Sequence, residues 1–152
     1  MIYERLLCET EKEGIDIIEL EFKGKSKGLY GNNVIALSKD IETLKEKQCV
    51  LAEELGHHYT SYGDILDTNK IVNIKQEKRA RNWAYEKLIG IVELINAYKK
   101  GVQDKHELAD YLGVTEGFLE EAISYYHSKY GVYYRIDNYV VYFDPLAILE
   151  IF

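Results

Sequence analysis

The sequence contains little proline and little cysteine, and these shortages exclude several classes of protein. One proline and 11 glycines among 152 residues are too few for a collagen-like or proline-rich chain. The two cysteines, Cys8 and Cys49, lie too far apart for a CxxC metal pair and cannot build a disulfide framework. We expect both to be buried thiols.

Long hydrophobic runs and an excess of positive charge are missing as well. No stretch approaches the roughly 18 uncharged apolar residues that a bilayer span needs, and the acidic N-terminal stretch is unlike a secretory signal. We therefore expect a cytoplasmic chain with no membrane partner. The 26 Asp and Glu outnumber the 19 Lys and Arg, and the net charge of -7 opposes binding to nucleic acid unless a local basic patch exists.

The composition that remains is that of a folded domain. Hydrophobic residues make up 47% of the chain and charged residues 30%, which excludes intrinsic disorder. The length fits one domain of about 100–150 residues, or one such domain with a small appendage. Helical and strand-like patterns occur in separate runs without βαβ alternation, so the sequence predicts an α+β fold.

Apolar spacing predicts the elements of the N-terminal part. The predicted elements are helices over residues 2–12, 40–62 and 73–100 and strands over residues 15–22 and 28–38. Ser38 or Asp40 can cap the middle helix, and Gly31, Asn32 and Asn33 suit a tight turn between two short strands. The strands predict a small antiparallel sheet.

The C-terminal part predicts two short helices and a hairpin. Residues 104–131 have the pattern of two helices joined at 112–114, with Thr115 capping the second, which is typical of a helix-turn-helix. This segment contains six acidic residues but only two lysines, so DNA binding is disfavoured. We expect a packing module that docks on the core or on a protein partner. VYYRI and YVVYF flank Asp137 and Asn138 as a hairpin would, and their tyrosines suit either sheet packing or a partner surface.

The strongest chemical signal is the run Glu53-Glu54-Leu55-Gly56-His57 in the middle helix. In the motif H-E-x-x-H, two metal ligands at i and i+4 face one side of a helix and the intervening Glu is a general base. Glu53 has the position of the first ligand and points within about 40° of His57 on a helix. The apolar residues 49–52 predict a buried helix, where carboxylates need a cation, a shared proton or a cleft.

Glu77 is the candidate for a third ligand. It lies three residues before Ala80 and seven before Ala84, and therefore on the apolar stripe of the next helix, which is an unusual place for a solvated charge. A carboxylate that arrives from a neighbouring helix would complete a three-ligand site. Such a site leaves a fourth position for water, as catalytic zinc requires.

Each of these residues also has a simpler interpretation. Glu53, Glu54 and His57 are consistent with the polar face of an ordinary helix, because Glu is a strong helix former. His58 points about 100° away from His57 and is more consistent with the edge of the core, or with a cleft, than with a metal ligand. His58 or Tyr59 could instead bind a substrate carbonyl, and the sequence does not choose between these roles.

The segments LAEELGHH and EKRARNWA resemble the ImmA/IrrE family of metallopeptidases, in which H-E-x-G-H is followed by E-x-x-A-N-x-F-A. The resemblance implies that Glu54 is the catalytic base and that His57 and Glu77 are metal ligands, with Glu53 in place of the first motif histidine. The implied cofactor is zinc. Because a His-Glu-Glu set is harder and more anionic than a His-His-Glu set, manganese and iron become competitive.

The chain departs from the family pattern at two further positions, where Arg81 replaces Asn and Trp83 replaces Phe. The resemblance implies a zincin-like metallopeptidase core over residues 1–100. Residues 101–152 then form a helix-turn-helix-like segment and a terminal β-hairpin packed on that core. The strand over residues 34–37 would line the cleft as an edge strand and pair with an extended substrate.

The function implied by the resemblance is hydrolysis of a regulatory protein. Family members commonly accompany phage or mobile-element repressors and act on such regulators. We therefore expect a metal-dependent endopeptidase whose substrate is a phage repressor-like protein. The alternative is a catalytically inactive zincin-like module that binds such a protein partner in phage gene regulation.

Overall fold

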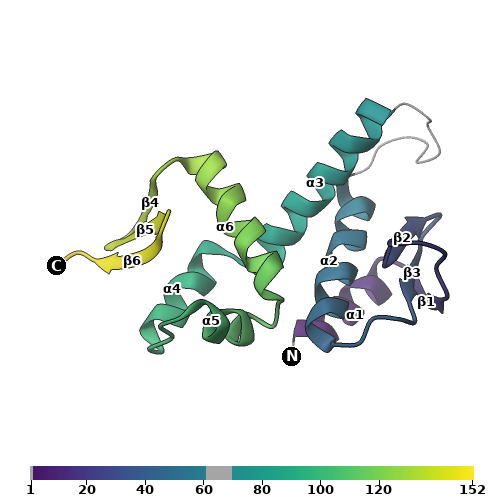
Figure 1. Ribbon diagram of the computed structural model, residues 1–152, viewed down its shortest axis with the longest axis horizontal. Helices are drawn as coiled ribbons and strands as arrows, with labels where there is room; N and C mark the ends of the chain where they lie inside the picture. Colours follow the sequence, from purple (N-terminus) through teal and green to yellow (C-terminus); the bar gives the residue numbers. More distant parts are fainter. Residues whose placement is uncertain (1, 61–69) are drawn as a thin grey trace. The chain divides into compact units, whose positions relative to one another are not determined.

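The computed structural model describes the backbone of residues 2–60 and 70–152, and the side chains of the same residues except 70–72. The described residues form six helices and two three-stranded sheets (Figure 1), so the α+β prediction is confirmed. No helix in this part of the chain is long and apolar enough to cross a membrane.

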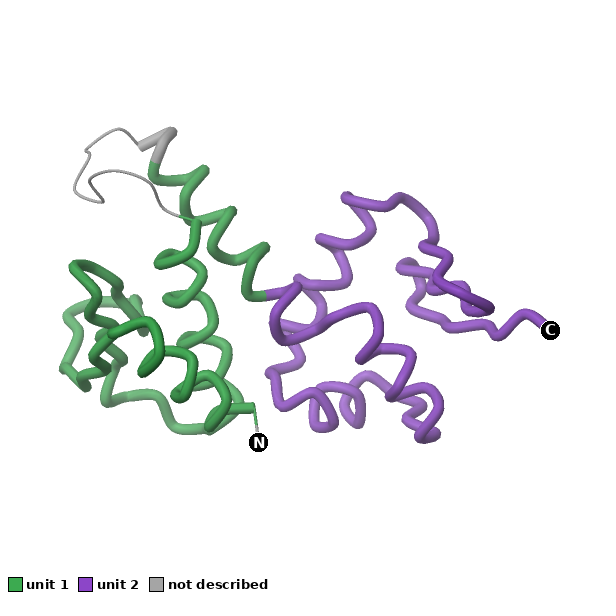
Figure 2. The backbone as a smooth tube through the Cα atoms, turned by 180° about the vertical axis from the view of Figure 1, so that it is seen from behind, with its two compact units in different colours: residues 1–84 green, residues 85–152 purple. Residues whose placement is uncertain are grey.

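The chain divides into two compact units, residues 1–84 and 85–152 (Figure 2). The boundary expected between residues 100 and 101 lies inside the second unit. The first unit contains α1 (Ile2–Lys12), β1 (Asp16–Leu20), β2 (Gly28–Gly31), β3 (Val34–Ser38), α2 (Leu44–Thr60) and most of α3 (Lys70–Leu88). The second unit contains the end of α3, α4 (Ile91–Lys99), α5 (Lys105–Leu112), α6 (Glu116–Tyr130), β4 (Tyr133–Ile136), β5 (Tyr139–Phe143) and β6 (Leu146–Glu150).

The sheet of the first unit has the order β1-β3-β2 and is mixed, because β1 runs parallel to β3 and β2 runs antiparallel to it. The prediction of a purely antiparallel sheet was therefore wrong in this detail. Asn32 and Asn33 take positive φ values of 48° and 59° and close the β2–β3 hairpin, as their residue types indicated. Since β3 is paired on both sides, the prediction that residues 34–37 form an edge strand was also wrong. The strand has the apolar character of a central strand, and Ile35 and Leu37 are fully buried.

Helix α2 lies against β2 and β3 with Leu51 and Leu55 fully buried. It begins later than predicted, because Thr43 is its cap and accepts a hydrogen bond from the amide of Glu46 at 3.2 Å. The Ser38 hydroxyl accepts the amide of Asp40 instead, at 3.1 Å, and so belongs to the preceding turn. The predicted end of this helix at residue 62 lies outside the described residues.

The two cysteines differ in burial. Cys49 is buried on α2, as expected, whereas Cys8 is exposed on α1. The prediction of a buried Cys8 was wrong because the buried stripe of α1 contains Leu6 and Thr10. Two residues after Leu6, a helix has turned by about 200°, and Cys8 faces away from the core.

The predicted helix over residues 73–100 is two helices, because the helical conformation is interrupted at Ile89 and Gly90. Gly90 has an extended backbone with ψ of 155°. The helical spacing of apolar residues continues across the break, so this spacing did not reveal it. Ile89 is fully buried at the break. Its carbonyl accepts a hydrogen bond of 2.6 Å from the hydroxyl of Tyr126 on α6, which satisfies a polar group released by the break.

The helix-turn-helix-like pair and the terminal hairpin are confirmed. Gly113 ends α5 in the left-handed conformation, with φ of 71°, and Thr115 caps α6 by accepting the amide of Phe118 at 3.1 Å. The apolar tail adds β6 to the hairpin as a third strand. Several tyrosines pack inside this unit, with Tyr130 and Tyr134 ring centroids 4.4 Å apart, which supports the packing interpretation for those residues.

We predict that Tyr126→Phe destabilises the protein by about 1–2 kcal/mol, because it leaves the buried Ile89 carbonyl without its donor. Urea denaturation followed by circular dichroism measures the change. Tyr111→Phe on α5 is the matched control, since Tyr111 is 42% exposed and should tolerate the loss of its hydroxyl. Equal stability of the Tyr126→Phe protein and the unmodified protein would contradict this role.

Candidate functional site

The candidate site is built where α2 and α3 touch. Gly56 of α2 lies directly against the backbone of α3, and a Cβ atom placed on it would come within 2.3 Å of the Ala80 carbonyl oxygen. Ala80 and Ala84 are fully buried on the facing side of α3. Small residues on both helices therefore allow a close backbone approach, which brings together the side chains next to the contact.

His57 and Glu77 meet beside this contact. The Nε2 atom of His57 lies 3.1 Å from Oε1 of Glu77, with the imidazole 12% exposed and the carboxylate 59% exposed. Hydrogen bonding to His57 lowers the pKa of Glu77, although partial burial opposes the shift. Burial disfavours protonation of His57, but the neighbouring carboxylates outweigh burial and raise its pKa. These opposite shifts favour an ion pair in which the proton resides on His57 and the Glu77 carboxylate accepts the hydrogen bond.

Glu54 is buried on the side of α2 that faces β2, with 8% of its surface exposed. Gly28 of β2 leaves the space for it, since a Cβ atom there would lie 2.8 Å from Glu54 Oε1. Burial raises the pKa of Glu54 to about 7, and Glu77 and Glu53 add to the shift while His57 opposes it. A carboxyl group with this pKa can both accept and release a proton near neutral pH.

Two side chains, His57 and Glu77, have donor atoms at a separation suitable for ligands of one metal ion. Two donors of a tetrahedral zinc ion lie about 3.4 Å apart when each bond is about 2.1 Å, and the His57–Glu77 separation of 3.1 Å is close to that. Glu53 is half-buried one helical turn before His57. Within the described residues, no three His, Cys, Asp or Glu side chains are arranged around one ion. The structure thus brings His57 and Glu77 together and does not add Glu53 to them.

His58 is held in a hydrogen-bonded chain. Its Nδ1 atom lies 2.7 Å from the hydroxyl of Tyr30 on β2, and its Nε2 atom lies 3.0 Å from Oε2 of Glu13. Both ring nitrogens are engaged by the protein, and the contact of His58 with a substrate stays a prediction. Sequence analysis missed Tyr30 and Glu13, because partners 28 and 45 residues away leave no spacing pattern.

Tyr59 is also engaged inside the first unit. Its hydroxyl donates to Oε1 of Glu9 at 3.0 Å, and its ring stacks on Trp83 with centroids 5.0 Å apart. These contacts engage both the hydroxyl and the ring of Tyr59, and its contact with a substrate carbonyl stays a prediction. Trp83, which replaces the family phenylalanine, instead uses its larger ring to join α3 to the end of α2.

Comparison with known families identifies the chain at this point. The family model described as the IrrE N-terminal-like domain, a peptidase family, matches residues 10–124. The chain belongs to this family. Its members are typically metal-dependent peptidases, which supports a metallopeptidase-like role for the chain. The comparisons with curated proteins and with solved structures found no match.

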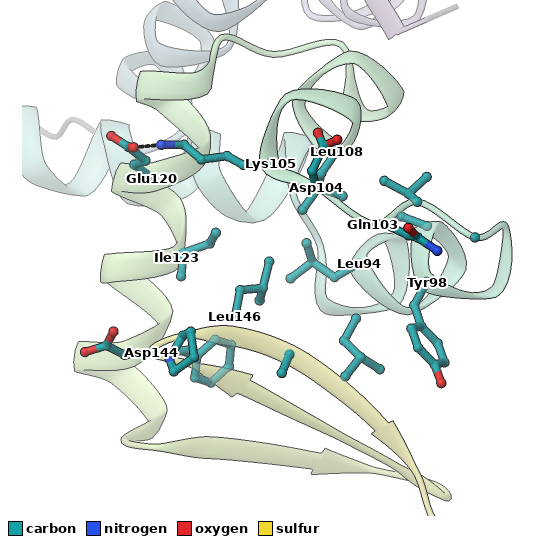
Figure 3. A pocket seen from close by; sticks show the side chains of 17 residues that line it. Leu94, Tyr98, Gln103, Asp104, Lys105, Leu108, Glu120, Ile123, Asp144 and Leu146 are labelled. Atoms are coloured by element: carbon teal, nitrogen blue, oxygen red, sulfur yellow. Dashed lines mark ion pairs between the residues drawn. The ribbon is translucent and has the colours of Figure 1, made fainter.

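The second unit contains a cavity that is separate from this site. Its volume is about 650 Å³, and it lies among α4, α5, α6 and β6 (Figure 3). Leu94, Ile123 and Leu146 project into it, and the ion pair of Lys105 and Glu120 lies at its rim. No predicted site residue lines it. The family match ends at residue 124, so the strands that close this cavity lie beyond the matched region.

We predict that Gly56→Ala destabilises the protein by about 1–3 kcal/mol, because the added methyl group overlaps the Ala80 backbone and forces the helices apart. Thermal and urea denaturation measure the effect. The matched control is Gly117→Ala on α6, where a Cβ atom meets nothing within 4 Å and should stabilise by roughly 0.4–1 kcal/mol. A Gly56→Ala protein as stable as the Gly117→Ala protein would refute the close contact.

Proposed function

We propose that this chain is a metal-dependent endopeptidase with a protein substrate. The observation that carries the proposal is the 3.1 Å contact of His57 with Glu77 between the two helices of the family motif. A mostly buried imidazole and a carboxylate from neighbouring helices are the donors expected of such a site. The family membership of the chain supports the same reaction class.

His57 and Glu77 would hold the metal ion, with Glu53 as the third donor. Glu53 precedes His57 by one turn of α2, so a change of its side-chain rotamer is the adjustment that the site requires. When bound, the ion would polarise the scissile carbonyl and increase the acidity of water. Zinc is the expected ion, and the second carboxylate makes manganese and iron competitive.

Glu54 would be the general base and then the general acid. Its carboxylate would take a proton from the attacking water and return it to the amine nitrogen that leaves. The position of Glu54 beside β2 supports this role, because Gly28 leaves the room that its Oε1 atom occupies. A larger residue at position 28 would displace the carboxylate from that space.

The substrate would approach along β2. This strand is at the edge of the sheet order β1-β3-β2, and it lies beside Glu54, so an extended polypeptide can pair with it. The ImmA/IrrE resemblance favours a regulatory protein of the cytoplasm, such as a phage repressor-like protein, as the substrate.

A catalytically inactive interaction module is the second candidate function. The observation that favours it is Glu53, which replaces the first motif histidine and is not gathered with His57 and Glu77 among the described residues. A protein of this kind would keep the fold to bind a regulator in phage gene regulation without cutting it.

Calorimetric titration with zinc, manganese and iron separates the two functions. We expect one ion per chain for the unmodified protein and an affinity at least ~100-fold weaker for His57→Ala and for Glu77→Ala. Glu42→Gln, at a carboxyl group outside the site, is the control and should bind as the unmodified protein does.

The second measurement is cleavage of a fluorescence-quenched peptide library. We expect Glu54→Gln to keep the metal and to lose about 10²–10⁴-fold in rate, because proton transfer contributes that much. If no ion binds and Glu54→Gln retains the biological effect of the protein, the enzyme proposal fails and the interaction module replaces it.

A further inference from the structure

Helix α3 has a positively charged surface in an acidic chain. Its described side chains, residues 73–88, contain five Lys and Arg but only two Glu, whereas the whole chain has a net charge of -7. Four of these cations, Lys75, Lys78, Arg79 and Arg81, are exposed and follow one another at helical spacing. We call this group the basic face of α3.

The basic face lies next to the candidate site. At about 100° per residue, its four side chains spread over one side of the helix, opposite the buried Ala80 and Ala84. Arg81 follows Glu77 by one turn and forms the border between the basic face and the site. Ile74, which is 66% exposed, lies between Arg81 and Lys78 around the helix and adds an apolar contact.

Three of the four charges of the basic face are not neutralised by the described part of the chain. Among the described residues, Lys75, Lys78 and Arg79 form no ion pair. Arg81 interacts electrostatically with Glu77, which also contacts His57 at 3.1 Å, and Glu86 pairs with Lys129 at 2.7 Å. Like charges three and four residues apart on a helix cost stability, so an external anion would gain the attraction that the described residues do not supply.

We propose that the basic face of α3 binds an acidic segment of the protein substrate and holds it beside His57 and Glu77. The inference rests on the proposed function, since it names the substrate class of that site. A polypeptide is favoured over nucleic acid because the basic face borders the site at which the proposed peptidase would act. A long phosphate backbone would in addition extend past the four cations onto the surface of a chain whose net charge is -7.

The test is fluorescence anisotropy with a labelled peptide in which Glu alternates with Ser, measured on the full chain carrying Glu54→Gln. A peptide with Gln in place of each Glu is the matched neutral probe, and a duplex DNA of random sequence is the competing polyanion. The test variant is Lys75→Glu/Lys78→Glu at the centre of the basic face. The matched control is Lys23→Glu/Lys25→Glu, two exposed cations of the same unit outside α3. Circular dichroism establishes that both variants fold.

We expect the Glu peptide to bind at least ~10-fold more tightly than the Gln peptide at an ionic strength of ~0.15 M. The Lys75→Glu/Lys78→Glu protein should lose about 10-fold in affinity, and the Lys23→Glu/Lys25→Glu protein should bind as the parent does. An equal loss in both variants, no preference for the Glu peptide, or tighter binding of the DNA would overturn the proposal. Because binding is measured without cleavage, absence of hydrolysis would refute the proposed enzyme and leave this result standing.

Discussion

The contact between Gly56 of α2 and the Ala80 backbone of α3 is the constraint on which the candidate site depends. A Cβ atom on Gly56 would come within 2.3 Å of the Ala80 carbonyl oxygen, so only glycine permits this approach. The approach brings His57 within 3.1 Å of Glu77, and each side chain obtains a partner for the solvation that it loses. Gly56, which has no side chain, thus determines whether His57 of α2 and Glu77 of α3 can come into contact.

Much of the fold could be predicted from local sequence signals. The turn at Asn32 and Asn33, the left-handed Gly113 and the Thr115 cap each depend on the conformational preference of one residue type. The break at Gly90 could not be predicted, because the apolar spacing continues across it and the hydrogen bond that stabilises it comes from α6. The pairing of β1 with β3 was missed for the same reason, since partners distant in sequence determine it.

The candidate site shows the same division between local and distant signals. The i, i+4 spacing on α2 and the acidic residue on the apolar stripe of α3 predicted that Glu77 would approach His57, and the structure places them in contact. The hydrogen bonds of His58 to Tyr30 and Glu13 join three segments that are far apart in sequence. The spacing of residues therefore could not predict these partners of His58. Burial of Glu54 beside β2 likewise depends on a strand far from it in sequence.

The short length of β2 limits what the sheet edge can contribute to recognition. Its four residues, Gly28–Gly31, have glycine at both ends, and only alternate residues of an edge strand turn their amide and carbonyl groups outward. Such an edge resists runaway strand addition between copies of the protein, and its few outward backbone groups can supply only part of the binding of an extended substrate. It also cannot discriminate among polypeptides, whose backbones are alike, and selectivity must therefore come from side chains outside the sheet.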